Sequence, residues 1–411
     1  MKSPIRHAVT FLLLFFAAHP GGLPAAPKKP PLARTEPTKP QAPLLENLAI
    51  AYLAVQRENL PPQAYFLPSA EDAGRQGARL AIVDDNTTGT FTRQQFELKE
   101  TVIGAEGDPA AAFRQLRAEG YRHILIDLPT ETTAILAGLP EAGDALLYNV
   151  ADGADELRGA RCAANLLHLI PSRAMRADAL AQYLAKKRWQ KLFLTVGPSP
   201  SDALYAAAVK RAAPRFGLKI ADEKAWEHSF DERRTPESEV PVFSQGSDYD
   251  LMVVADEDGL FGDLLSYRTW SPRPVAGTHG LVPAAWHPTL EQWGAIQLQN
   301  RFREQAKRWM TEIDYAAWLA IRAIGEAAAR TRSVEFGRIR DYLLSDAFAL
   351  AGFKGVPLSF RRWDGQLRQP MLLAGERSLV AVAPIDGFLH PRNELDTLGY
   401  DQPETLCKTP R

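Results

Sequence analysis

Apolar strands alternate with helices along most of this chain, and the pattern occurs twice. A buried strand is predicted at 123–129 (HILIDLP), and a helix precedes it at 108–120, with Asp108 as its N-cap. Alternation of this kind is typical of a parallel β-sheet with helices on both faces. We therefore predict an α/β fold made of two lobes, 44–160 and 161–290, each with a parallel sheet flanked by helices.

The other elements follow from apolar periodicity. Segment 70–89 has two interpretations, because ARLAIV has the apolar run of a strand whereas Ala73, Gly77 and Leu80 recur at helical spacing. Further strands are predicted at 48–56, 96–103, 145–152, 191–197, 218–226 and 250–256. Further helices are predicted at 130–139, 172–189, 201–217, 288–305, 314–333 and 336–346. Beyond these, 291–390 is predicted to return and complete both lobes, with a hairpin around Asp364-Gly365, and 391–411 is predicted to be a surface tail.

The N-terminus has the composition of an export signal. Lys2 and Arg6 precede the apolar run AVTFLLLFFAA, and small residues follow it. A basic segment, a short apolar core and small residues form a secretory signal peptide, which we assign to 1–26. The Pro- and Lys-rich segment 27–43 is interpreted as an extended tether. The formal charge of −1 gives no general attraction to nucleic acid, so we expect a periplasmic protein without a nucleic-acid partner.

The chain has two cysteines, Cys162 and Cys407. In an oxidising compartment, two cysteines are a candidate disulfide, and this one would join the C-terminal tail to the middle of the chain. The alternative is two free thiols, one of them buried and the other on the tail. We favour the disulfide.

The common catalytic signatures are missing from the sequence. It contains no G-x-S-x-G, H-E-x-x-H or G-x-G-x-x-G motif and no phosphate loop ending in Gly-Lys-Ser/Thr. His279 and His287 leave a metal site or a degenerate hydrolase open, and Cys162 with His168 leaves a thiol nucleophile open. Ordinary hydrogen-bonded histidines and a disulfide explain these residues more simply. We therefore expect a binding protein with no catalytic residue and no cofactor.

Polar residues collect where the predicted strands end. In LMVVADEDG (251–259) a buried strand leads directly into three acids. Ligands of parallel α/β proteins bind at the carboxyl ends of strands, where helix N-termini direct their N–H groups. An ordinary helix N-cap is the alternative role for each of these residues. The candidate ligand-binding residues are Thr130, Glu131, Thr132, Asp152, Ser199, Asp202, Asp256, Glu257 and Asp258.

The acids among these candidates have no obvious Lys or Arg beside them in the sequence. Unpaired carboxylates that converge in a cleft are costly unless a cation, an amine or protons neutralise them. The interpretation therefore predicts that Glu131 and the acids of 256–258 face a space between the two lobes.

Two segments of the first predicted lobe resemble a known family. EDAGRQGARLAIVDDNTTG (71–89) and DPAAAFRQLRAEGYRHILIDLPTETT (108–133) are similar to the opening lobe of type I periplasmic solute-binding proteins, in the branch of the leucine/isoleucine/valine-binding proteins of ABC importers. Four later segments, 161–189, 279–302, 314–327 and 388–408, resemble the subfamily associated with PQQ-dependent alcohol dehydrogenase systems. The similarity covers roughly 45–408.

This resemblance implies a monomeric periplasmic receptor with two lobes joined by a hinge. Such a receptor binds its ligand between the lobes, and its closed form docks on a membrane permease driven by an ATPase. The resemblance also implies that 70–89 is a helix and that no catalysis occurs.

The loop LPTETT departs from the amino-acid-binding relatives, in which this loop is rich in Ser and Thr. Glu131 would repel a carboxylate ligand if it faced the cleft. Two ligand classes are therefore kept: a small neutral or hydroxylated solute of alcohol metabolism, and a hard cation such as calcium or a lanthanide. A periplasmic sensor or accessory protein for the dehydrogenase system is the alternative function.

Overall fold

The computed structural model describes residues 45–56, 70–104, 106–227 and 235–409. The signal peptide predicted for 1–26 and the tether predicted for 27–43 lie outside the described residues. The described residues belong to one compact unit, which begins at residue 44. Among them, no helix combines the length and the apolar character needed to cross a lipid bilayer.

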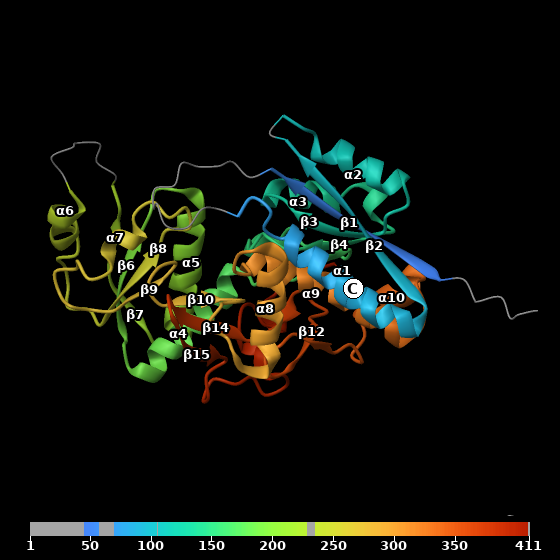
Figure 1. The fold of residues 1–411 in the computed structure, drawn as a ribbon. Helices are drawn as coiled ribbons and strands as arrows, with labels where there is room; N and C mark the ends of the chain where they lie inside the picture. The colour runs from blue at the N-terminus through green and yellow to red at the C-terminus, as the bar shows by residue number, and fades with distance from the viewer. Residues whose placement is uncertain (1–44, 57–69, 105, 228–234, 410–411) are drawn as a thin grey trace, which may run out of the picture. The chain divides into compact units, whose positions relative to one another are not determined.

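The first lobe is built on a parallel sheet with the strand order β2-β1-β3-β4-β5 (Figure 1). Its strands are β1 (Glu46–Val55), β2 (Gln94–Ile103), β3 (His123–Asp127), β4 (Leu146–Asn149) and β5 (Leu166–His168). Successive residues of β1 point to opposite faces, so that Ile50 and Tyr52 enter one core whereas Ala51 and Leu53 enter another. Because both faces are buried, these strands are apolar runs in the sequence.

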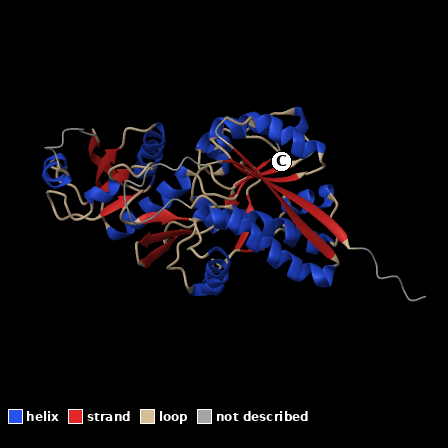
Figure 2. Ribbon diagram, turned by 45° about the horizontal axis from the view of Figure 1, so that its top comes forward, coloured by secondary structure: helices blue, strands red, loops and turns tan. Residues whose placement is uncertain are grey.

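Helices cover both faces of this sheet (Figure 2). α1 and α9 share the core on one face, and α2 and α3 share the core on the other. The α-helices of this lobe are α1 (Arg75–Thr92), α2 (Pro109–Ala118), α3 (Thr130–Ala137), α8 (Ala295–Ala306), α9 (Glu312–Thr331) and α10 (Phe336–Leu343). The short 3-10 helices are η1 (Pro140–Ala142), η2 (Asp155–Arg158) and η3 (Gln292–Gly294).

Two glycines allow α1 and α9 to pack closely. A Cβ on Gly77 of α1 would lie 1.8 Å from the backbone oxygen of Asp314, and a Cβ on Gly325 of α9 would lie 2.2 Å from the carboxylate of Asp85. At Gly77 the clash is with backbone, so only glycine fits there, whereas a Cβ at Gly325 would require the Asp85 carboxylate to shift. The helix that was ambiguous in the sequence is thus joined to a segment more than two hundred residues later in the chain.

The second lobe is built on a parallel sheet with the order β7-β6-β8-β9. Its strands are β6 (Lys191–Val196), β7 (Lys219–Ala225), β8 (Leu251–Ala255) and β9 (Val275–Gly277), and its helices are α4 (Arg173–Lys187), α5 (Pro200–Arg215), α6 (Pro236–Phe243) and α7 (Gly262–Leu265). α4 and α5 pack on one face of this sheet, and an aromatic cluster that includes Phe193 and Trp226 fills the other. Both sheets therefore have the two covered faces expected of parallel strands.

The end of the chain adds two antiparallel sheets. One has the order β10-β14-β15 and lies against α4, and the other has the order β11-β12-β13. Their strands are β10 (Val282–Ala284), β11 (Leu350–Ala351), β12 (Pro357–Phe360), β13 (Leu367–Arg368), β14 (Met371–Gly375) and β15 (Ser378–Ala383). The chain thus passes between the two lobes after β5, after β10 and after β13.

The predicted elements agree with the structure at most positions. Segment 70–89 is helical from Arg75 onward, as α1, and Asp108 caps α2 by accepting a hydrogen bond from the backbone N–H of Ala110 at 2.8 Å. One boundary differs: β5 pairs with β4, so the first lobe continues beyond residue 160. With only three residues, β5 is too short for its periodicity to be recognised.

The C-terminal segment has little regular secondary structure, but it is strongly anchored to the rest of the chain. It contains η4 (Glu394–Thr397) and η5 (Gln402–Glu404). Arg361 is 1% exposed and donates to Asp396 at 3.0 Å and to the backbone oxygens of Leu395 and Leu398. A disulfide joins Cys162 to Cys407. The predicted tail is therefore held to the body by a buried ion pair and a covalent bond.

Candidate functional site

A cavity of about 370 Å³ is lined by residues from both lobes. The first lobe contributes Asp152, which follows β4, and Glu312, the first residue of α9. The second lobe contributes polar side chains from the ends of β8 and β9 and from α4 and α5. These residues are Arg173, Arg176, Tyr205, Glu257 and Thr278.

Arg173 and Glu257 form a bidentate ion pair within the second lobe. The Arg173 Nε donates to Glu257 Oε1 at 2.9 Å, and Nη2 donates to Oε2 at 2.6 Å. Burial lowers the pKa of Arg173, but the Glu257 carboxylate outweighs this effect, so that the pKa lies above its ordinary value. Arg173 therefore carries its charge at any physiological pH.

A second bidentate pair, Arg176–Glu312, joins the two lobes. The Arg176 Nη2 donates to Glu312 at 2.7 Å, and Nη1 donates to the same carboxylate at 3.1 Å and to the backbone oxygen of Pro283 at 2.9 Å. Glu312 also accepts a hydrogen bond from the backbone N–H of Ala285. Burial lowers the pKa of Arg176, but the field and the hydrogen bonds of Glu312, together with smaller contributions from Tyr205 and Glu257, raise the pKa above its ordinary value. The pair thus fixes α4, α9 and one of the segments that connect the lobes at a single point.

Asp152 is held by hydrogen bonds rather than by an ion pair. Its carboxylate accepts hydrogen bonds from the Thr130 hydroxyl and, at 2.8 Å, from the backbone N–H of Ala154. Asn149, at the end of β4, accepts from the backbone N–H of Asp152 at 2.9 Å and donates to its carbonyl at 2.8 Å. The geometry of the β4 loop therefore directs this carboxylate to the cavity.

Tyr205 of α5 is 2% exposed and lines the same cavity. Its hydroxyl has no hydrogen-bond partner in the described part of the chain. Burial raises the pKa of this phenol, so it stays protonated. Tyr205 therefore brings to the cavity wall a buried, neutral hydroxyl whose capacity to donate and to accept is unused among the described residues.

Two of the candidate residues predicted from the strand ends, Asp152 and Glu257, line this cavity. Thr130 contacts it indirectly, through Asp152. Glu131 lies on the surface, with a side chain that is 69% exposed and paired with Arg161 at 2.6 and 2.9 Å. Thr132 is half-buried on the first turn of α3.

The other predicted residues stabilise the turns that follow β6 and β8. Asp256 is buried and accepts from the backbone N–H groups of three residues, 260–262, at 2.6–2.9 Å. Ser199 and Asp202 form the capping box of α5, and Asp202 also accepts from the backbone N–H of Glu257 at 2.6 Å. Asp258 is exposed. The N-cap alternative thus describes Ser199 and Asp202.

The idea of unpaired acids was wrong for Glu131 and Glu257, since each is paired with an arginine that is distant in sequence, Arg161 and Arg173. Within the described ranges, no group of three or more His, Cys, Asp or Glu side chains is placed to hold a metal ion.

The residues considered for hydrolysis do not share a hydrogen-bond partner. His279 contacts the Thr278 hydroxyl at 3.0 Å, whereas His287 contacts the Thr289 hydroxyl at 2.7 Å. Cys162, the thiol considered as a nucleophile, is bound in the disulfide. The two histidine contacts are local, between residues one and two positions apart.

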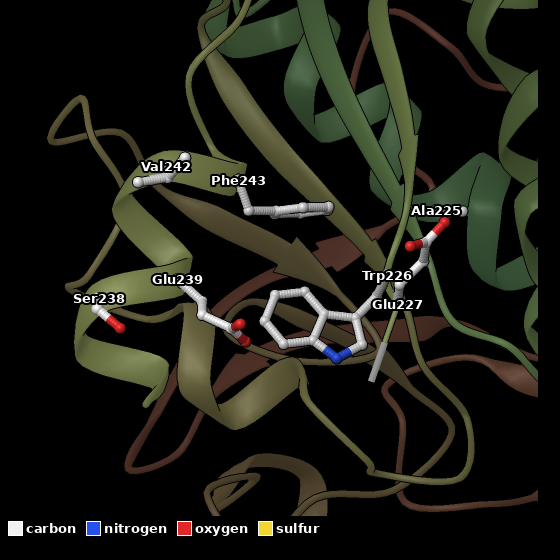
Figure 3. A pocket seen from close by; sticks show the side chains of 7 residues that line it. All are labelled: Ala225, Trp226, Glu227, Ser238, Glu239, Val242 and Phe243. Carbon is white, nitrogen blue, oxygen red and sulfur yellow. The ribbon is translucent and has the colours of Figure 1, made fainter. Parts of the chain in front are cut away.

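A second cavity, of about 380 Å³, belongs to the second lobe alone (Figure 3). Trp226, at the end of β7, stacks on Phe261 at a centroid distance of 4.9 Å and meets Phe243 edge-on at 5.0 Å. Figure 3 shows the Glu239 carboxylate beside the indole. Its lining residues come from the end of β7, the two residues that follow it, and α6, so this cavity does not connect the lobes.

The arginines and Tyr205 were not among the residues predicted from the sequence. Arg173 directly follows Ser172, the N-cap of α4, and Glu312 directly follows Thr311, the N-cap of α9. Both positions are near helix N-termini, where ligands of α/β proteins bind. This position was the only signal available, since the partners of each ion pair are 84 and 136 residues apart.

Comparisons with protein-family models and with curated proteins find no match. Among solved structures, a branched-chain amino acid ABC transporter periplasmic ligand-binding protein from Burkholderia xenovorans LB400 matches with a TM-score of 0.67 and 15% identity. A periplasmic binding protein from Burkholderia mallei matches at 0.65 and 13%, and a solute-binding protein from R. palustris in complex with benzoate matches at 0.62 and 10%. Each match covers 88% of this chain and 99% of the other. This chain therefore has the two-lobed α/β fold of type I periplasmic binding proteins.

Proposed function

We propose that this chain is the periplasmic substrate-binding component of an ABC importer and that it binds a small solute in the cavity shared by the lobes. The observation that carries the proposal is the composition of this cavity, to which both lobes contribute charged side chains. A solute bound there contacts both lobes at once, so its binding favours one arrangement of the lobes over others. This function involves no bond making, and no enzymatic activity is proposed.

The descriptions of the structurally similar proteins support this proposal. Two of them are described as a ligand-binding protein and a solute-binding protein of ABC transporters. The composition of 1–26 supports export to the periplasm. The partners would be a permease and an ATPase in the inner membrane, and the receptor would act as a monomer.

We propose further that this importer serves PQQ-dependent alcohol oxidation. The support is the sequence resemblance of 161–189, 279–302, 314–327 and 388–408 to the binding proteins of such systems. The first of these segments carries Arg173 and Arg176. The solute would then be a small molecule of alcohol metabolism rather than the ligand of the structurally similar proteins.

Isothermal titration of the purified chain tests the receptor proposal. The panel contains leucine, benzoate, polyols, short alcohols, aldehydes, calcium and lanthanum. We expect saturable binding of one organic solute at a one-to-one ratio, and its loss in Arg173→Met. Arg377→Met, at a side chain that is 90% exposed, is the matched control and should bind as the wild type does.

Two outcomes would contradict the proposal. Binding of no organic solute at all would remove the receptor function, and binding of calcium or lanthanum alone would replace it by a cation receptor. Uptake of the labelled solute into cells that lack this chain tests the transport step. Unchanged uptake would favour a sensor or an accessory protein of the dehydrogenase.

A further inference from the structure

Tyr205 lines the shared cavity, and its side chain carries an unused hydrogen-bonding group, the hydroxyl. It is buried and has no partner among the described residues, although Arg176 and Glu257 lie close enough to affect its titration. Buried polar atoms without a partner are rare in folded proteins, and each requires an explanation. A bound molecule that supplies the missing partner is such an explanation, because the side chain lines a cavity of about 370 Å³.

Arg173 and Asp152 have further capacity beside this hydroxyl. Arg173 uses Nε and Nη2 for Glu257, and its Nη1 has no hydrogen-bond partner in the part of the chain that the structure describes. The two Asp152 oxygens each accept one hydrogen bond, and a carboxylate oxygen can accept a second. The cavity thus offers a donor at Arg173, an acceptor at Asp152 and a group of either kind at Tyr205.

The charges of the cavity disfavour an anion. Its lining contains three carboxylates, those of Asp152, Glu257 and Glu312, and two guanidinium groups. Both guanidinium groups are already in bidentate pairs with Glu257 and Glu312. A carboxylate ligand would have to compete with these glutamates for the arginines, next to an additional negative charge on Asp152.

A cation is disfavoured by the hydrogen bonds that remain. An ammonium group donates only, so it satisfies Asp152 but leaves the Arg173 Nη1 without an acceptor. A hydroxyl group both donates and accepts, and it therefore fits all three groups without adding a charge. From the unpartnered hydroxyl and the paired charges, and on the basis of the proposed receptor function, we propose that the ligand is a neutral molecule with several hydroxyl groups and that Tyr205, Arg173 and Asp152 bind it.

Four linear six-carbon molecules test the charge and the hydroxyl requirement together. Sorbitol is neutral, gluconate is an anion, glucamine is a cation and glucosaminate is a zwitterion, and all four have a similar size. Isothermal titration of the purified chain should give the tightest binding for sorbitol. Tighter binding of any of the three charged molecules would overturn the assignment of the ligand class but would leave the receptor proposal intact.

A wider panel separates the failure of this inference from the failure of the receptor proposal. If leucine, benzoate or a short alcohol binds and no polyol among glycerol, myo-inositol and sorbitol does, the receptor stands and the polyhydroxylated ligand is rejected. If nothing on the panel binds, both are rejected.

Tyr205→Phe tests the role of the hydroxyl. The variant should bind sorbitol about three- to tenfold more weakly, the usual effect of one hydrogen bond. Tyr183→Phe, at a half-buried tyrosine of α4 outside the cavity, is the control and should bind sorbitol as tightly as the wild type. Equal binding by both variants would overturn the assignment of Tyr205.

Thermal melting without ligand gives a second measurement on the same variant. Removal of a hydroxyl that has no partner should leave the melting temperature unchanged or raise it. A lower melting temperature for Tyr205→Phe would indicate that the hydroxyl already has a partner in the protein, and it would contradict the inference.

Discussion

Lys354 is a buried ammonium group on the segment by which the chain returns from the first lobe to the second. It is 2% exposed, donates to Gln369 and to the backbone oxygen of Pro370, both at 2.8 Å, and lies 5.0 Å from the centre of the Tyr315 ring. None of these partners carries a full negative charge. Burial therefore lowers the pKa of Lys354 from 10.5 to about 7, and the field of Glu312 only partly opposes this effect.

This low pKa makes the stability of the protein depend on pH in a defined direction. Below pH 7 both the native and the unfolded chain hold the proton, so the cost of burying the ammonium group is fully present. Between about pH 7 and 10.5 the native Lys354 loses its proton whereas the unfolded chain keeps it, so the free energy of unfolding rises with pH. From pH 7 to pH 9 the gain integrates to about 2 kcal/mol.

Lys354→Met removes this contribution. The wild type should gain about 2 kcal/mol more than the variant when the pH is raised from 7 to 9, as measured by urea unfolding followed by tryptophan fluorescence. The variant also leaves Gln369 and Pro370 without their donor. This second effect does not depend on pH, and it cancels in the difference between the two pH values.

Lys187→Met, at an exposed lysine of α4, is the control and should reproduce the pH response of the wild type. If Lys354→Met gains as much free energy of unfolding as the wild type does, Lys354 is not the group that titrates. The argument from burial would then be refuted.

Three further changes should lower the free energy of unfolding. Replacing both Cys162 and Cys407 by Ser opens a loop of 245 residues and should cost about 2–5 kcal/mol in urea unfolding, and an equal loss should follow reduction of the wild type. Arg361→Met removes one of the two arginines that pair with the buried Asp396, while Arg368 remains, and should cost about 1.5–3 kcal/mol; a loss below 1 kcal/mol would contradict the ion-pair argument. Gly77→Ala should cost about 1–3 kcal/mol because its Cβ overlaps α9, whereas Gly104→Ala meets no atom within 4 Å and should be neutral in thermal melting.

The parallel sheets could be predicted because their strands are buried on both faces. β3 and β8 are each five residues long and fully buried, and they are visible as apolar runs. Strands of three residues, such as β5, β9 and β10, carry too few positions for a period of two to be recognised. They form because longer neighbours supply the hydrogen-bonding edge, which is a property of the assembled sheet rather than of the segment.

The charges of the cavity could be predicted only in part. That acids follow β4 and β8 is visible in the sequence, and Asp152 and Glu257 do line the cavity. That Glu257 is neutralised by Arg173 is not visible, because the two residues are 84 positions apart and meet only once α4 has packed beside β8. The absence of a neighbouring cation in sequence is therefore no indication that a carboxylate is unpaired.

Whether an acid at a strand end stabilises a loop or lines the cavity depends on whether nearby backbone N–H groups donate hydrogen bonds to its carboxylate. Asp256 is followed by a tight turn in which three backbone N–H groups donate hydrogen bonds to its carboxylate. This side chain therefore stabilises the turn. Glu257 has a longer side chain, and its backbone N–H is taken by Asp202. This contact fixes the backbone of Glu257 while leaving its carboxylate free to reach Arg173 at 2.6 Å. The short acid thus stabilises the loop, and the longer acid beside it becomes part of the cavity.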